Sequence, residues 1–246
     1  FPKEKMTMER LIELGALDEE AAGFLKLLVK ARYNIFVSGG TGAGKTTFLN
    51  ALSDYIPKTE RIITIEDSAE LQLRDVENLV RMETRNSNVE GENAITIRDL
   101  IKASLRMRPD RVIVGEVRDS AAIDMLPAMN TGHDGSLSTG HANSAYDMIT
   151  RLESMVLMGI ELPMEAVRRQ IASAVDIIIH LGRLRDGSRK VTEICEVTGI
   201  ENGQVQLMSL YEFEEQAEKG RKTVQGHLKK KAALQNKEKL KRAGLE

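Results

Sequence analysis

Apolar residues recur along the chain in short blocks with two different spacings. Where they fall every three to four residues, a helix with one buried face is expected. Such segments lie at 6–32 (two short helices), 45–52, 96–107, 121–132, 145–159 and 163–175. Short apolar runs bounded by glycine, proline or charged residues predict buried strands at 34–38, 61–65, 111–115 and 135–141. A weaker alternation marks 79–85, and 86–94 is polar enough to be a loop.

The order of these elements predicts an α/β fold. Strands and helices alternate up to about residue 175, which favours a mostly parallel central sheet with helices on both faces. Apolar runs at 176–184, 190–200 and 204–213 then follow one another across short turns, so antiparallel hairpins are expected at the end of the sheet. Asp18 and Thr96 are suited to cap the helices after them, and Pro127 is expected to interrupt its helix.

The end of the chain differs in composition from the rest. Residues 1–213 carry the alternating pattern and are taken as one domain, whereas 214–246 form a strongly basic tail. The leucines of this tail are too sparse for a broad apolar face, so a solvated helix or a frayed, flexible end is the simplest interpretation. A contact with a neighbouring subunit or with anionic lipid, particularly through the lysines at 229–231, is the alternative.

Bulk composition narrows the possible functions. The 246 residues carry a formal net charge of −2, so the molecule as a whole is not a polycation for nucleic acid. Aromatic residues make up 4% of the chain and tryptophan is absent, which leaves few surfaces for base stacking. The single cysteine, Cys195, excludes an internal disulfide and a multi-cysteine metal site. Because the chain begins with Phe1, we expect a fragment or processed piece whose N-terminal domain is missing.

Residues 39–46, GGTGAGKT, match the pattern G-x-x-x-x-G-K-[ST] between a predicted strand and a predicted helix. Glycines let the backbone N–H groups point at phosphate oxygens, and the helix adds its positive N-terminal end to the same place. The pattern predicts a P-loop NTPase that binds ATP and Mg²⁺. Its predicted nucleotide-binding residues are Gly39, Gly40, Thr41, Gly42, Ala43, Gly44, Lys45, Thr46 and Thr47.

Three side chains of this loop have separate expected roles. Lys45 would bridge the β- and γ-phosphates, Thr46 would place its hydroxyl on Mg²⁺, and Thr47 would reach the α-phosphate.

Ionisable residues follow three other predicted strands. Glu66 and Asp67 come after 61–65, Glu116 comes after 111–115, and His141 ends the strand at 135–141. Because the carboxyl ends of parallel strands share one edge of a sheet, these groups are expected to meet beside the P-loop. Surface charge would explain any one of them, but the three together favour a catalytic site. Glu116 is then expected to hold Mg²⁺ through water and to orient or deprotonate the attacking water.

Four arginines surround the strand that ends at Glu116. Arg106, Arg108, Arg111 and Arg118 would either neutralise charge in the transition state or face water and neighbouring carboxylates. The second interpretation is favoured for any single one, and Arg106, Arg108 and Arg118 are kept as possible phosphate contacts.

Four stretches together resemble the ATPases of type II and type IV secretion systems, and within them the pilus-assembly ATPases of tight-adherence (Flp-type) machinery. They are SGGTGAGKTT, ERIITIEDSAELQL, LRMRPDRVIVGEVRD and AMNTGHDGSLSTGHANS. The later stretch RLRDGSRKVTEICEV is similar too, so the resemblance runs from about residue 10 to residue 213.

This resemblance implies a RecA-like core that assembles as a homo-hexameric ring with nucleotide between subunits. Glu116 matches the family's Walker B glutamate, and Glu66 its acidic-box glutamate, which works at metal-bound water. His141, and less directly His133, match histidines that sense the γ-phosphate. The resemblance also implies trans-acting arginines on the missing N-terminal domain and an inner-membrane platform protein as partner.

We therefore predict a cytoplasmic motor, peripheral to the inner membrane, that hydrolyses ATP to power pilus assembly or protein secretion. The alternative is a nucleic-acid motor of the conjugative DNA-transfer or RecA-like type. Such a motor needs a basic, aromatic-lined groove, which the chain outside its tail does not offer, so no nucleic acid is expected as a partner. A nucleotide-binding regulator without turnover is disfavoured by Glu66, Glu116 and His141 together.

Overall fold

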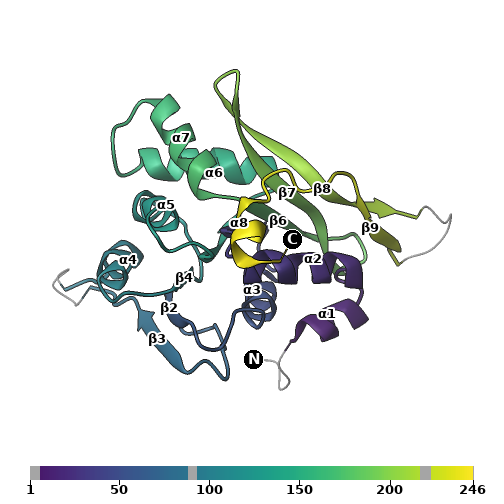
Figure 1. Ribbon diagram of the computed structural model, residues 1–246, viewed down its shortest axis with the longest axis horizontal. Helices are drawn as coiled ribbons and strands as arrows, with labels where there is room; N and C mark the ends of the chain where they lie inside the picture. Colours follow the sequence, from purple (N-terminus) through teal and green to yellow (C-terminus); the bar gives the residue numbers. More distant parts are fainter. Residues whose placement is uncertain (1–5, 88–92, 217–222, 246) are drawn as a thin grey trace.

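One nine-stranded sheet runs through the computed structural model, which describes residues 6–87, 93–216 and 223–245 (Figure 1). The strand order is β3-β2-β4-β5-β1-β6-β7-β8-β9. Parallel pairing joins β1 (Ile35–Gly39), β2 (Arg61–Glu66), β3 (Asn78–Glu83), β4 (Arg111–Val114), β5 (Leu137–His141) and β6 (Ile177–Arg183). Antiparallel pairing adds β7 (Arg189–Glu201), β8 (Gln204–Glu215) and β9 (Gly226–Lys230). The predicted fold class, with its parallel sheet and terminal hairpins, is confirmed.

Helices cover both faces of the parallel strands (Figure 1). One face packs against α1 (Met8–Glu13), α2 (Glu19–Lys30), α3 (Lys45–Ser53) and α8 (Glu238–Ala243). The other packs against α4 (Ile97–Leu105), α5 (Ala122–Asn130), α6 (Ala145–Leu157) and α7 (Met164–Ala174). Alternate strand residues serve the two cores: Val37 of β1 belongs to the first and Phe36 to the second. No helix in the described ranges is long and apolar enough to cross a membrane.

The predicted helix caps are present, but the predicted break at Pro127 is wrong. Asp18 accepts a hydrogen bond from the Ala21 amide at 2.8 Å, and Thr96 forms a reciprocal capping box with Asp99. Helix α5 runs through Pro127 without interruption. The apolar residues on both sides of this proline are buried against the sheet, so packing holds the helix together despite the missing N–H group.

The register of the parallel strands aligns their carboxyl ends. β1 lies between β5 and β6, so Gly39 is paired with His141 on one side and with Leu181 on the other. Backbone bonding continues past the end of β4, where the Gly115 amide donates to Ile65 at 2.8 Å. The Val117 amide donates to Thr139 at 2.9 Å. The segment that carries Glu116 is therefore fixed between β2 and β5.

Strand β9 and the loop after it pack against the sheet, so the interpretation of the tail as a solvated helix or a frayed end is wrong for residues 226–236, whereas α8 is a short helix without buried residues. Strand β9 pairs with β8, and Leu228 and Leu234 are 7% and 8% exposed. The Glu196 carboxylate accepts hydrogen bonds from the amides of Gln235 at 2.8 Å and Asn236 at 2.7 Å. Leu228 lies in a strand and Leu234 in a loop, so the spacing expected of a helix could not indicate that they are buried.

Carboxylates of the same chain pair with several tail lysines. Lys229 and Lys231 contact Glu214 at 3.2 and 2.6 Å. Lys239 contacts Asp134 at 2.8 Å and Asp176 at 2.6 Å. Part of the positive charge that would face anionic lipid in the alternative interpretation is thus paired with carboxylates within the fold.

Replacing Lys239 by methionine should weaken the docking of α8. Asp176 is largely buried, and burial already raises its pKa while Lys239 opposes that shift. Removing the ammonium leaves a buried carboxylate uncompensated, so we expect a loss of about 3 kcal/mol in the free energy of unfolding, measured by urea denaturation. Lys237→Met, at an exposed position of the same segment, is the control and should change little. Equal losses in both variants would contradict this assignment.

Candidate functional site

The loop between β1 and α3 forms a cradle for anions. Gly42 and Gly44 have φ values of 72° and 93°, in the left-handed region that glycine adopts without strain. A Cβ atom on Gly39 would lie 2.7 Å from the carbonyl oxygen of Leu181, so the end of β1 also requires glycine. Helix α3 begins at Lys45, directly after the loop, and the free N–H groups of its first turn face the same space.

Lys45 and His141 are in direct contact at the edge of the sheet. The Lys45 Nζ atom lies 3.2 Å from His141 Nδ1 and 3.3 Å from the Gly40 carbonyl oxygen, to which it donates. Burial lowers the pKa of Lys45, although the nearby Glu116 opposes the shift. Burial also lowers the pKa of His141 below its ordinary value, so the neutral ring is favoured. Since an ammonium only donates, Nδ1 accepts and the ring proton is assigned to Nε2.

Glu116 lies on the other side of the same imidazole ring. Its Oε1 atom is 3.1 Å from His141 Nε2 and 3.2 Å from Arg118 Nε, and Arg118 also reaches Asp67 at 3.3 Å. This Oε1 atom is buried and receives no well-aligned hydrogen bond from the described residues. Lys45, His141 and Glu116 therefore form one continuous line of polar contacts beside the P-loop.

The residues at this edge fit Mg²⁺ bound mainly through phosphate and water. No group of three or more His, Cys, Asp or Glu residues within the described part of the chain is arranged to hold a metal by itself. The Thr46 hydroxyl, in the first turn of α3, and the Glu116 carboxylate are oxygen ligands of the kind Mg²⁺ prefers. A metal that keeps several waters and phosphate oxygens needs no more protein ligands than these.

Glu66 lies at the same edge but is held by its own loop. Its side chain packs against Gly115, where an added Cβ would lie 3.1 Å from Glu66 Cγ. Its Oε1 atom accepts hydrogen bonds from the amides of Glu70 at 3.0 Å and Leu71 at 2.8 Å. Glu66 is 5% exposed, and burial raises its pKa. These contacts give Glu66 a part in shaping the loop after β2, and its action on metal-bound water stays a prediction.

Several other predicted residues lie away from this site within one chain. Arg106 and Arg108 precede β4, whereas Glu116 follows it, so they lie toward the opposite end of that strand. His133 precedes β5 in the same way and is separated from His141 by the length of the strand. Arg111 is fully buried and pairs with Glu60 at 2.6 Å. Of the predicted arginines, the structure brings Arg118 to Glu116.

One arginine beside Glu116 was missed by the sequence analysis. A hollow of about 480 Å³ is lined by Thr41, Glu116, Val117, Arg118, His141 and Arg151. Arg151 comes from α6, and within the described residues it forms no ion pair. On a helix that is amphipathic throughout, nothing in the sequence distinguishes it from a solvated surface arginine.

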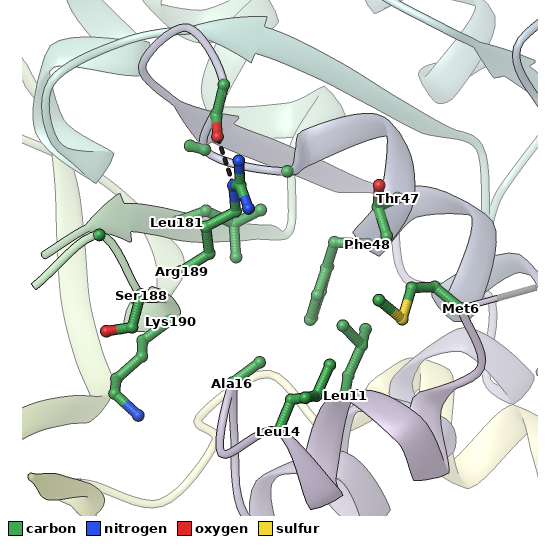
Figure 2. Close-up of a pocket in the computed structure, with 14 residues that line it drawn as sticks. Met6, Leu11, Leu14, Ala16, Thr47, Phe48, Leu181, Ser188, Arg189 and Lys190 are labelled. Atoms are coloured by element: carbon green, nitrogen blue, oxygen red, sulfur yellow. Dashed lines mark hydrogen bonds between the residues drawn. The ribbon is translucent and has the colours of Figure 1, made fainter. Parts of the chain in front are cut away.

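A larger pocket of about 600 Å³ lies on the other side of the P-loop (Figure 2). Figure 2 shows Thr47 and Phe48 of α3 along one wall, with Arg189 at the start of β7 opposite them. The remaining wall is mostly apolar and comes from the start of the chain: Met6, Leu11, Leu14 and Ala16. The pocket thus joins a phosphate-type loop to an apolar surface.

Comparisons with known proteins identify the family of the chain. Residues 1–243 match the model of the family described as type II/IV secretion system protein. The conjugal transfer protein TrbB of Rhizobium radiobacter is 36% identical over 202 residues, covering 81% of this chain and 59% of that protein. The VirB11 ATPase of the Brucella suis type IV secretion system, solved with sulphate, is 36% identical with a TM-score of 0.65, covering 76% of this chain and 55% of that one.

A second solved structure, the pilus retraction motor PilT with bound ADP, has a TM-score of 0.59 at 28% identity. The match covers 85% of this chain and 53% of that one. The chain thus spans less than two thirds of the length of the curated relatives and solved structures that it matches.

The loop-holding role of Glu66 predicts a difference between two substitutions. Glu66→Ala leaves the amides of Glu70 and Leu71 without their acceptor, so we expect a loss of about 2 kcal/mol in the free energy of unfolding. Glu66→Gln keeps an acceptor oxygen at Oε1 and should lose less than half of that. Chemical denaturation of the two variants measures both values, and equal losses would argue against these hydrogen bonds as the cause.

Proposed function

The chain belongs to the type II/IV secretion system protein family, and we propose that it is the ATP-hydrolysing core of a motor of that class. The observation that carries the proposal is the contact of His141 with both Lys45 and Glu116 beside the P-loop. A phosphate-binding amine and a carboxylate suited to a general base thus share one crevice. This is the arrangement that hydrolysis of a terminal phosphate requires.

The P-loop would bind the phosphates of the nucleotide, and the pocket beside it would bind the nucleoside. Backbone N–H groups of residues 44–47 and the Lys45 ammonium would hold the β- and γ-phosphates. The pocket of about 600 Å³, which begins at Gly42 and Thr47, would take the nucleoside against Phe48 and Leu11. Its mostly apolar walls suit a base and a ribose better than a further charged group.

Glu116 would be the group that acts on the attacking water. Its carboxylate lines the hollow beside the P-loop, where it would accept a proton or a hydrogen bond from water. Arg118 holds the carboxylate from one side and His141 from the other, which fixes its direction. When bound, Mg²⁺ would neutralise phosphate charge beside Thr46. Movement of the Lys45 ammonium toward a γ-phosphate would remove the donor from His141 Nδ1, so this histidine would register the phosphate.

The motor role follows from the family rather than from contacts within one chain. The solved structures that the chain resembles are named as a type IV secretion ATPase and a pilus retraction motor, which supports work on a secretion or pilus machine. We propose a homo-hexameric ring at the cytoplasmic face of the inner membrane that acts on a platform protein in pilus assembly or secretion. Arginines from outside this chain would complete the hollow that Arg151 and Arg118 line.

Substitutions at the two ends of the polar line should separate binding from hydrolysis. In the full-length protein, Lys45→Ala should abolish both ADP binding and phosphate release. Glu116→Gln should keep ADP binding and lower phosphate release at least about 100-fold, because it removes the base without disturbing the loop. Glu161→Gln, at an exposed position between α6 and α7, is the control and should leave both unchanged. Turnover that persists in both site variants would refute the assignment.

A motor for DNA transfer is the second candidate, favoured by the resemblance to a protein named for conjugal transfer. Such a motor would bind single- or double-stranded DNA through phosphates, with an affinity that falls steeply with salt. We expect ATP hydrolysis by the full-length protein to be unchanged by added DNA between low and physiological salt. A salt-sensitive stimulation by DNA would favour the second candidate over pilus assembly or protein secretion.

A further inference from the structure

The turn between β6 and β7 contacts the P-loop through a single arginine. Arg189, the first residue of β7, donates from Nε to the Gly42 carbonyl oxygen at 2.7 Å. Its Cδ atom lies 3.4 Å from the position that a Cβ on Gly44 would occupy. Residues 147 positions apart in the sequence thus meet at the loop that is proposed to hold phosphate. Neither the P-loop pattern nor the ionisable strand ends pointed to this residue.

The turn that presents Arg189 is held by its own hydrogen bonds. The Asp186 carboxylate accepts from the hydroxyl of Ser188 at 2.6 Å, from the Ser188 amide at 2.9 Å and from the Val224 amide at 2.7 Å. These bonds, led by that from the Ser188 hydroxyl, lower the pKa of Asp186 to about 2, so it stays ionised in the neutral range. Arg189 therefore projects from a fixed backbone, and the segment before β9 contributes to fixing it.

Arg189 keeps donors that nothing in the described chain uses. Its side chain is exposed, and within the described residues no carboxylate pairs with it. The other basic side chain around this pocket, Lys190, donates to the Gly15 carbonyl oxygen at 2.7 Å and lies over the Phe213 ring. Among the described residues, the terminal nitrogens of Arg189 have no hydrogen-bond partner at the pocket wall.

The position of the guanidinium matches the middle of a nucleotide. At one end of the pocket lie the P-loop glycines and Thr47, and at the other lie the apolar side chains of Leu11 and Leu14 (Figure 2). Figure 2 shows the Arg189 guanidinium between the loop and the open space. A nucleotide whose β-phosphate lies in the loop and whose base lies on the apolar wall would bring its α-phosphate to this level of the pocket.

Resting on the proposed function, we propose that Arg189 is a nucleotide-binding residue that donates hydrogen bonds from its terminal nitrogens to the α-phosphate. Its Nε bond to Gly42 sets the direction of the guanidinium before the ligand arrives. An arginine already oriented in this way loses less side-chain freedom when it binds phosphate, and its planar fork suits phosphate oxygens. The antiparallel end of the sheet would thereby take a direct part in nucleotide binding.

The test measures binding of ADP, and of ADP with one α-phosphate oxygen replaced by sulfur, to the full-length protein by calorimetry. Arg189→Ala should weaken ADP binding about 10-fold or more. The wild-type protein should prefer ADP to at least one of the two sulfur diastereomers, and that preference should shrink in the variant. Arg189→Gln keeps a donor for the Gly42 carbonyl but no charge, and it should behave like Arg189→Ala.

Matched variants separate this inference from its premise. Arg185→Ala removes an arginine of the same turn that pairs with Glu215 instead of the P-loop, and it should bind ADP normally. Normal ADP binding by Lys45→Ala would overturn the proposed function and this inference with it. If Lys45→Ala loses ADP but Arg189→Ala does not, or if Arg189→Ala weakens ADP and its sulfur analogues equally, the inference fails while the proposed function stands.

Discussion

The parallel hydrogen-bond register around β1 is the constraint on which the rest of the structure depends. Gly39 can lie between His141 and Leu181 because β1 pairs in register with both β5 and β6. A shift of one residue in either pairing would turn alternate side chains to the wrong core and move His141 away from the P-loop. The two apolar cores on opposite faces of the sheet are what hold this register.

Partial burial gives the polar groups at this edge their chemical character. Burial lowers the pKa values of Lys45 and His141, so the neutral imidazole is favoured; it accepts from the ammonium at Nδ1, and its Nε2 atom lies 3.1 Å from Glu116 Oε1. The cationic Lys45, the neutral His141, the anionic Glu116 and the cationic Arg118 then follow one another in a row of contacts. Such a row of contacts polarises along its length, so a phosphate bound at Lys45 would change the surroundings of the Glu116 carboxylate.

The antiparallel end of the sheet bears on the nucleotide site as well as on stability. It places the turn before β7 against the P-loop, where Arg189 donates to Gly42. That turn is itself tied to the last part of the chain through the Val224 amide and Asp186. The C-terminal segment packs beside α2. Its Lys239 forms an ion pair with Asp176, just before β6. One continuous set of contacts therefore links the end of the chain to the phosphate loop.

The sequence alone determined the α/β class, the P-loop and the ionisable residues at the strand ends, because these depend on local periodicity and on the topology of parallel strands. Only the tertiary structure decided which groups touch. Glu66 accepts hydrogen bonds from its own loop. Arg106, Arg108 and His133 lie toward the opposite ends of the strands. Leu228 and Leu234 are buried. The tertiary structure also brought Arg151 and Arg189 to the P-loop edge, because long-range packing positions such side chains and leaves no trace in the spacing of neighbouring residues.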